Sequence, residues 1–484
     1  MVLEQVLQIS KSIFNVVLSF LLSSVFSLGK GTQKMEVNQE IERQTDVSIE
    51  IEDVDTENLD MVREAEALIP IKPPHDPVVT SIREMLEGVA PLSPDCSIYK
   101  VPEKLQKVNG EAYTPRVVSI GPLHHGQKSL QAMEEHKLRY LQSFLSRTIL
   151  ILEDIVRDVR MWEERARRCY AEAIELSSDD FVKMILVDAS FIVEVLLRSY
   201  FPQFIEGSDR IFHKPCMIDD IGRDMLLLDN QLPFFVLEGF LTLVFVSDGE
   251  TFPSILDLTH QHFKNLLNIG TFPNTISSTE VKHFLDFLRF CYLPLSPRVW
   301  QKSSRMDRFS PSASSLHDAG IKFKVGTGRC LLDIKFANGV IEIPHLEIDD
   351  LTEILFRNLI AFEQCHYAYK YIIQYMALMD SMINTPKDVE LLIHHKIITS
   401  RLGSNEDIST LFNKICKEVV LGHNFYFLSL CDNLNAYCTT PWHKWKATLK
   451  RDYFNKPWAI VSVIAAIVLL ILTFVQAVCS LISI

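Results

Sequence analysis

Residues 118–141, VSIGPLHHGQKSLQAMEEHKLRYL, gather side chains that could bind a metal ion or transfer protons. His124 and His125 are adjacent in a turn between two glycines, and Glu134 follows in a helical stretch. Metal ligands on one helix need a spacing of three or four residues to share a face. Because this spacing matches no established metal signature, it favours a structural corner shaped by Gly121 and Gly126, which permit unusual backbone angles.

A second polar island, LDNQLP at 228–233, interrupts an apolar run. We expect Asp229 and Asn230 to cap a helix that begins near Pro233. A buried carboxylate needs a partner, and Arg116 or a histidine is the candidate. A composite site therefore remains a weak alternative, which would belong to a metal-dependent hydrolase-like enzyme: His124, His125, Glu134 and Asp229.

Other patterns that could carry chemistry are weak. In AFEQCHY, Glu363 and His366 share a helical face, but neighbours such as Cys365 and His366 do not face each other, so core packing is favoured. The chain has no P-loop, no GxSxG elbow, no kinase motif set and no CxxC pair. We therefore predict no cofactor and no bound metal, and an enzyme is the less favoured class.

The elements that would position these residues are mainly helices. Apolar residues recur at helical spacing, whereas LLDIKFANGVIEI alternates around Asn338-Gly339, a strong hairpin signal. IKFKVG, just before, is a candidate third strand. We thus predict a mainly α fold, a large helical domain with a small inserted β-hairpin or sheet. The expected helices cover 127–176, with Ser129 as its N-cap, 181–201, 223–246 broken at Pro233, 280–290, 351–379, 389–399, 407–420 and one from about 422.

The net charge of −13 over 484 residues is unevenly distributed. Residues 36–66 contain twelve acidic and two basic side chains, a net charge of −10. This stretch is poor in aromatic residues and is expected to be disordered. No cluster of Lys and Arg suggests a nucleic-acid surface, so nucleic acid is not an expected partner.

The C-terminal stretch 457–484 contains no charged side chain. About twenty apolar residues suffice to cross a bilayer, so we predict a transmembrane helix that binds the lipid bilayer as a single-pass C-terminal anchor. The basic flank Lys450, Arg451 and Lys456 then places the main domain in the cytosol, and Trp458 fits an interfacial aromatic belt. The membrane would be the plasma membrane or an endomembrane.

The N-terminal segment is apolar with a polar stripe along one helical face. It could be an amphipathic helix, a signal sequence or a second anchor, and these alternatives stay open. The predicted organisation has four parts: an apolar segment at 1–30, an acidic disordered linker at 31–77, a mostly helical domain at 78–452 and the transmembrane helix at 457–483.

Several long motifs resemble the plant DUF247 (UPF0481) family over about residues 96–478. They include YTPRVVSIGPLHHGQKSLQAMEEHKLRYL, MLLLDNQLPFFVLE, FRNLIAFEQCH and YFNKPWAIVSVIAA, in the family's order. Leu123 stands where the family usually has an aromatic residue and Asp229 where it usually has Glu. The resemblance implies a plant membrane protein with a C-terminal anchor and no established enzymatic activity. In grasses, some members are linked to self-incompatibility as pollen-side recognition determinants.

Three functional hypotheses follow. The favoured one is a membrane-anchored, non-enzymatic recognition or signalling protein with an unknown protein partner. The second is the metal-dependent hydrolase-like enzyme described above. The third is an extracellular receptor-like module, which requires the N-terminal segment to be a cleaved signal.

Overall fold

The computed structural model describes residues 76–87, 93–214, 216–244, 252–267, 269, 276–294, 309–328, 330–422, 425–440 and 457–482. The chain divides into two compact units, Met1–Val89 and Ala90–Ile484. In the first unit the structure describes one helix, α3 (Pro77–Glu87). The predicted segments at 1–30 and 36–66 lie outside the described residues, and the predicted domain boundaries stay predictions.

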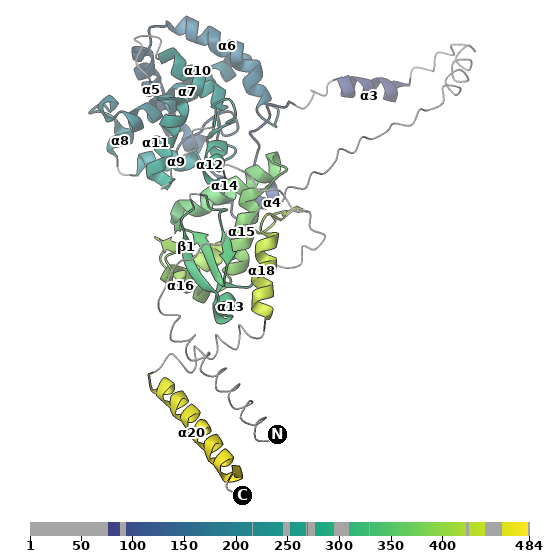
Figure 1. Cartoon of the computed structure of the whole chain (residues 1–484). Coiled ribbons are helices and arrows are strands. Elements are labelled where there is room, and N and C mark those ends of the chain that lie inside the picture. The colour runs from purple at the N-terminus through teal and green to yellow at the C-terminus, as the bar shows by residue number, and fades with distance from the viewer. Residues whose placement is uncertain are drawn as a thin grey trace, which may run out of the picture. The chain divides into compact units, whose positions relative to one another are not determined.

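One part of the second unit is a set of helices around α7 (Ser178–Tyr200). The Ser177 hydroxyl accepts a hydrogen bond from the Asp180 N–H and so caps the start of this helix. Most of α7 is buried, and the helix predicted over 181–201 is confirmed. Figure 1 shows α5, α6 and α10 beside α7. The helices packed on α7 are α5 (Glu134–Arg147), α6 (Leu152–Arg168), α10 (Phe234–Val244) and α11 (Ile255–Leu267).

The single helix predicted over 127–176 is wrong, because the chain breaks there into η3 (Lys128–Met133), α5 and α6. Between α5 and α6, Thr148 is extended. Its hydroxyl donates to the Leu243 carbonyl at 2.8 Å and accepts from the Leu150 N–H at 3.1 Å. One long-range and one local bond of the hydroxyl thus stabilise the extended backbone at the break. Ser129 lies inside η3 and caps no helix.

The predicted β-hairpin is confirmed. β2 (Lys335–Ala337) and β3 (Val340–Pro344) pair antiparallel, and Asn338 and Gly339 between them have φ of 52° and 73°. Two left-handed residues make the turn that matches the twist of a hairpin. The third strand is also confirmed: β1 (Lys322–Gly326) pairs with β3, in parallel.

A second small sheet corrects a predicted helix. α16 (Pro386–His394) ends before residue 399, and Lys396 has a φ of 58°. The chain then continues as β5 (Ile398–Ser400), which pairs in parallel with β4 (Leu346–Ile348). A left-handed residue stops a helix, so the apolar run that follows α16 is free to pair as a strand.

The helix predicted over 351–379 forms as two, since the backbone at Tyr367 is extended. Most of the other predicted helices form with shifted ends, so the mainly α fold with small sheets is confirmed. The remaining elements are α4 (Glu103–Gln106), η2 (Gly110–Tyr113), η4 (Pro202–Phe204), α8 (Arg210–His213), α9 (Met217–Asp224), α12 (Phe284–Tyr292), α13 (Ala313–Asp318), α14 (Asp350–His366), α15 (Tyr371–Met382), α17 (Asn405–Ile415) and α18 (Leu428–Thr439).

The C-terminal stretch forms a helix, α20 (Pro457–Ile482). Within the described part of the chain, however, no helix is both long and apolar enough to cross a membrane, so the transmembrane prediction is not supported. Lys450, Arg451, Lys456 and the side chain of Trp458 lie outside the described residues.

Candidate functional site

The two polar motifs of the sequence meet in space, and Asp224 makes the first link. Its carboxylate accepts hydrogen bonds from the N–H groups of Arg116, Val117 and Val118 at 2.7–3.0 Å. The Arg223 guanidinium donates to the same carboxylate at 2.8 Å. Asp224 is fully buried at the end of α9. Its negative charge therefore holds the chain segment that leads into the GPLHHG turn.

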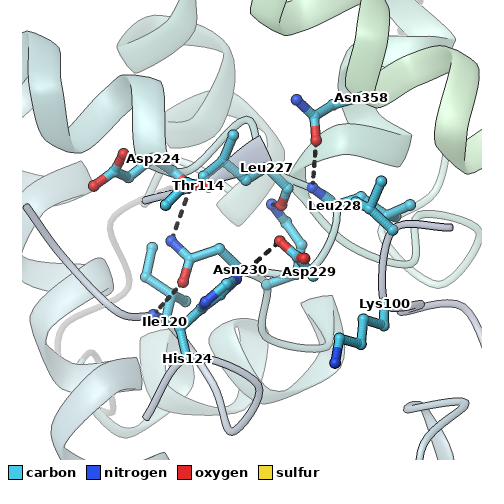
Figure 2. Close-up of polar contacts among 12 residues, drawn as sticks. Lys100, Thr114, Ile120, His124, Asp224, Leu227, Leu228, Asp229, Asn230 and Asn358 are labelled. Atoms are coloured by element: carbon cyan, nitrogen blue, oxygen red, sulfur yellow. Dashed lines mark hydrogen bonds and ion pairs between the residues drawn. The ribbon is translucent and has the colours of Figure 1, made fainter. Parts of the chain in front are cut away.

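Asn230 makes the second link, and Figure 2 shows its amide among these backbone groups. The side-chain oxygen accepts from the Ile120 N–H at 2.7 Å. The nitrogen donates to the carbonyls of Val118 and Asp224 at 3.1 and 3.0 Å. The prediction that Asn230 caps the next helix is therefore wrong, because all of these amide bonds go to other backbone groups.

Gln231 binds its own loop in the same manner. Its amide nitrogen donates to the carbonyls of Met225 and Leu227, both at 2.7 Å. Its oxygen accepts from the Phe284 N–H at 3.1 Å, which ties the loop to the start of α12. All of this lies in the interior. A polar side chain is tolerated in a core when its hydrogen bonds are made, as those of this amide are.

Asn358 of α14 binds the LDNQLP loop from the other side. It accepts from the Leu228 N–H at 3.0 Å (Figure 2) and donates to the carbonyls of Ala112 and Ile354 at 2.8 Å. The helix α14 is thus connected through one side chain to the LDNQLP loop and to η2. Truncation of such a residue would leave several buried backbone groups without partners, which is costly.

The GPLHHG turn depends on its first glycine. Gly121 has a φ of 75°, and a Cβ there would lie 2.5 Å from the Gln231 carbonyl oxygen. Its N–H donates to the Asp188 carboxylate at 2.9 Å. Gly126, at the other end of the turn, has a φ of 79°. The prediction that these glycines permit unusual backbone angles is confirmed.

Glu134 pairs with the buried Lys137. The Lys137 ammonium lies 2.7 Å from Asp188 and 2.7 Å from Glu134, and it donates to the Ser119 hydroxyl at 3.3 Å. Burial alone would lower the pKa of Lys137, but the Asp188 and Glu134 carboxylates outweigh it and raise the pKa. Lys137 therefore stays charged, and Glu134 is its partner.

His124 and Asp229 are the two predicted candidates that the fold brings together. His124 Nε2 lies 3.0 Å from Asp229 Oδ1, an ion-pair contact when the ring is protonated (Figure 2). The Asp229 side chain is 4% exposed and that of His124 14%. The amide nitrogen of Gln127 lies within hydrogen-bond distance of the other ring nitrogen of His124, 2.8 Å from Nδ1. The predicted partner of the Asp229 carboxylate is thus the histidine and not Arg116.

The four candidates of the composite site do not converge. Glu134 is bound to Lys137, and His125 is exposed. No three His, Cys, Asp or Glu side chains are grouped to hold a metal ion anywhere in the described residues. A shallow cleft lined by Tyr292, Asp349, Phe356 and neighbouring residues contains none of the four. What the His124–Asp229 contact can do is join the GPLHHG turn to the LDNQLP loop.

The AFEQCH motif is likewise structural. Glu363 is fully buried, lies 2.8 Å from the Arg289 guanidinium and accepts from the Ile373 N–H at 3.0 Å. His366 Nδ1 lies 2.9 Å from the Tyr99 hydroxyl. Each side chain joins α14 to another part of the body, a name used below for the described residues of the second unit between 93 and 440. The expectation of a packing role is confirmed for both residues.

Sequence reasoning missed the residues that carry most of these links: Asp188, Asp224, Lys137 and Asn358. The available signal was a polar residue inside an otherwise apolar helical run, as in MILVDASFIV and ILFRNLIAF. A polar side chain at a buried position requires a partner. The pattern does not tell which distant backbone group that partner is.

Comparisons with known proteins agree with the motifs. Residues 98–472 match the family model DUF247, described as a plant protein of unknown function. The chain is 31% identical over 420 residues to the UPF0481 protein At3g47200 of Arabidopsis thaliana, covering 80% of this chain and 87% of the relative. It is 24% identical over 479 residues to the putative UPF0481 protein At3g02645 of the same plant, covering 78% and 89%. No solved structure matches.

Proposed function

Since the chain belongs to the DUF247 (UPF0481) family of plant proteins, we propose that it is a non-enzymatic recognition or signalling protein held at a lipid bilayer. One observation carries the proposal. Three of the four candidate side chains are occupied, since His124 contacts Asp229 and Glu134 contacts Lys137, and the fourth, His125, is exposed. A catalytic group must instead reach a substrate in a cleft.

Attachment to lipid is supported by α20. Its side chains include exposed apolar residues such as Leu469, Leu470 and Val475, and residues 457–484 carry no charge. Apolar surface removed from water contributes about 25 cal/mol per Å². A bilayer would cover such a helix on every side, and the basic flank at Lys450 and Lys456 would lie beside anionic headgroups.

The basic flank also favours a cytosolic body, at the plasma membrane or an endomembrane. We propose this orientation for the chain, with protein partners on the cytosolic side. The narrower role in self-incompatibility is one form of recognition, and no observation on the described residues favours it over others. The same is true of the hydrolase-like alternative.

The proposal is tested with the full chain, tagged at both ends, expressed in plant cells. In flotation on a density gradient the full chain should rise with the lipid, and a matched chain that stops at residue 456 should stay in the soluble fraction. In sealed microsomes, protease should digest the body without added detergent. A full chain that stays soluble would contradict lipid attachment, and a protected body would contradict the cytosolic orientation.

A further inference from the structure

The helix α3 (Pro77–Glu87) of the first unit carries an exposed apolar face. Its large apolar residues are spaced as one face of a helix, and each is between 48% and 70% exposed: Val78, Val79, Ile82, Met85 and Leu86. Arg83 and Glu84, which are exposed as well, lie outside this face. The helices around α7, in contrast, bury most of their apolar residues.

The helix α3 needs another surface packed against its apolar face to be stable. Its start is defined locally, because the Asp76 carboxylate accepts a hydrogen bond from the Val78 N–H at 2.9 Å. It has 11 residues, however, and isolated helices shorter than about 12–15 residues are marginal in water. Burial of the apolar face against another surface would supply the missing stabilisation.

The charge of the neighbouring sequence indicates what kind of surface can pack against the apolar face of α3. Residues 36–66 carry a net charge of −10 and are separated from Pro77 by ten residues, a reach of about 40 Å at most. Such a charge repels anionic lipid and a second copy of the same chain. The polar face of α3 also carries only one basic residue, Arg83, next to the acidic Glu84, whereas helices lying on membranes carry several Lys and Arg.

We propose that α3 docks through this apolar face into a groove of a protein partner whose rim carries Lys and Arg. An amphipathic helix lying in an apolar groove is a recurring mode of recognition. The acidic stretch then accelerates the encounter and rejects grooves with an acidic rim. This inference rests on the proposed function and names the chemistry of one partner.

The probe is a pair of designed helical proteins with the same apolar groove, one rimmed by Lys and Arg and the other by Asp and Glu. Purified full chain in detergent should bind the basic groove at least about tenfold more tightly than the acidic one. Raising the salt concentration should weaken that binding. Equal affinity for the two grooves, or no binding to either, would overturn the proposal.

Two variants test the face itself. Ile82→Asp should weaken binding to the basic groove at least about tenfold, whereas Thr80→Asp adds the same charge to the opposite face and should change it less than about threefold. Equal effects of the two variants would overturn the proposal. A photo-cross-linker at position 85 gives an independent readout: cross-linking within the chain or to a second copy would overturn it, and cross-linking to the bound basic groove would support it.

The experiments distinguish failure of the docking proposal for α3 from failure of the proposed function. If the α3 experiments fail while truncation at residue 456 still releases the chain from lipid, the attachment through α20 stands and only the docking role of α3 is lost.

Discussion

The body of the second unit and the two helices α3 and α20 use opposite kinds of side chain in opposite places. In the body, charged and amide side chains such as Asp224, Lys137 and Asn358 lie in the interior and bind backbone or each other. In α3 and α20, large apolar side chains are exposed. The chemically richest residues of this chain therefore lie inside its scaffold, whereas its simplest apolar helices expose their side chains.

The largest expected effect is the loss of a buried link. Asp224→Ala removes the acceptor of three backbone N–H groups and leaves Arg223 without its carboxylate. We expect the free energy of unfolding to fall by about 3–5 kcal/mol, measured by urea denaturation. Asp219→Ala, at an exposed position of the same helix, should cost less than about 1 kcal/mol. Similar losses of unfolding free energy for both variants would contradict the claim that the buried carboxylate stabilises the fold more than the exposed one.

A buried histidine should make the body sensitive to acid. Burial lowers the pKa of His283 to about 3, and its ring nitrogens contact the Ser97 carbonyl and the Asp286 N–H. Because the unfolded chain takes up this proton near pH 6.5, the stability is fully present above that pH and falls as the pH drops toward 3. The loss should reach about 2 kcal/mol between pH 6.5 and pH 5.

His283→Asn is the matched control for this pH dependence. Asparagine can still cap α12 but does not titrate, so the slope of stability against pH should decrease by about 1.4 kcal/mol per pH unit in this range. Denaturation curves at several pH values measure the slope. An unchanged slope in the variant would show that another group is responsible.

The contact between His124 and Asp229 should contribute less. A double-mutant cycle of His124→Gln and Asp229→Asn should give a coupling free energy of about 1 kcal/mol, since it is one of several contacts that join these two chain segments. The cycle of His125→Gln with Asp229→Asn should give a coupling near zero. A coupling for His125 as large as that for His124 would contradict the geometry.

The smallest effect is expected in α3. Ile82→Asp should change the free energy of unfolding of the body by less than about 0.5 kcal/mol, because Ile82 is exposed. The same change at Ile192, which is fully buried in α7, should cost more than about 4 kcal/mol. A large loss for Ile82→Asp would mean that α3 is part of the folded core.

Local signals in the sequence predicted local structure well. Asn338-Gly339 between alternating residues predicted the hairpin, because that dipeptide adopts the left-handed angles of the turn. Periodicity predicted α7. It failed at Thr148 and Tyr367, where the apolar pattern continues but the backbone becomes extended. Those breaks depend partly on contacts with distant residues, such as the bond from Thr148 to the Leu243 carbonyl.

The candidate site shows the same limit. The sequence indicated that Asp229 needs a partner and named a histidine among the options, and the fold supplies His124. It also suggested that Asn230 caps a helix, a use that its spacing allows. The amide instead binds Ile120 and Val118, which lie more than a hundred residues earlier in the chain. Only the tertiary arrangement decides between these uses.

We propose that the motif residues hold the scaffold together without a catalytic metal, and one measurement tests this most directly. The unfolding free energy of the full chain and of Asp229→Asn is measured with and without excess Mn²⁺ or Zn²⁺. We predict that the metal stabilises neither chain and that the variant is less stable in both conditions. A wild-type chain stabilised by about 2.7 kcal/mol, as expected for an ion at a hundred times its Kd, would contradict the account if the variant lost that gain.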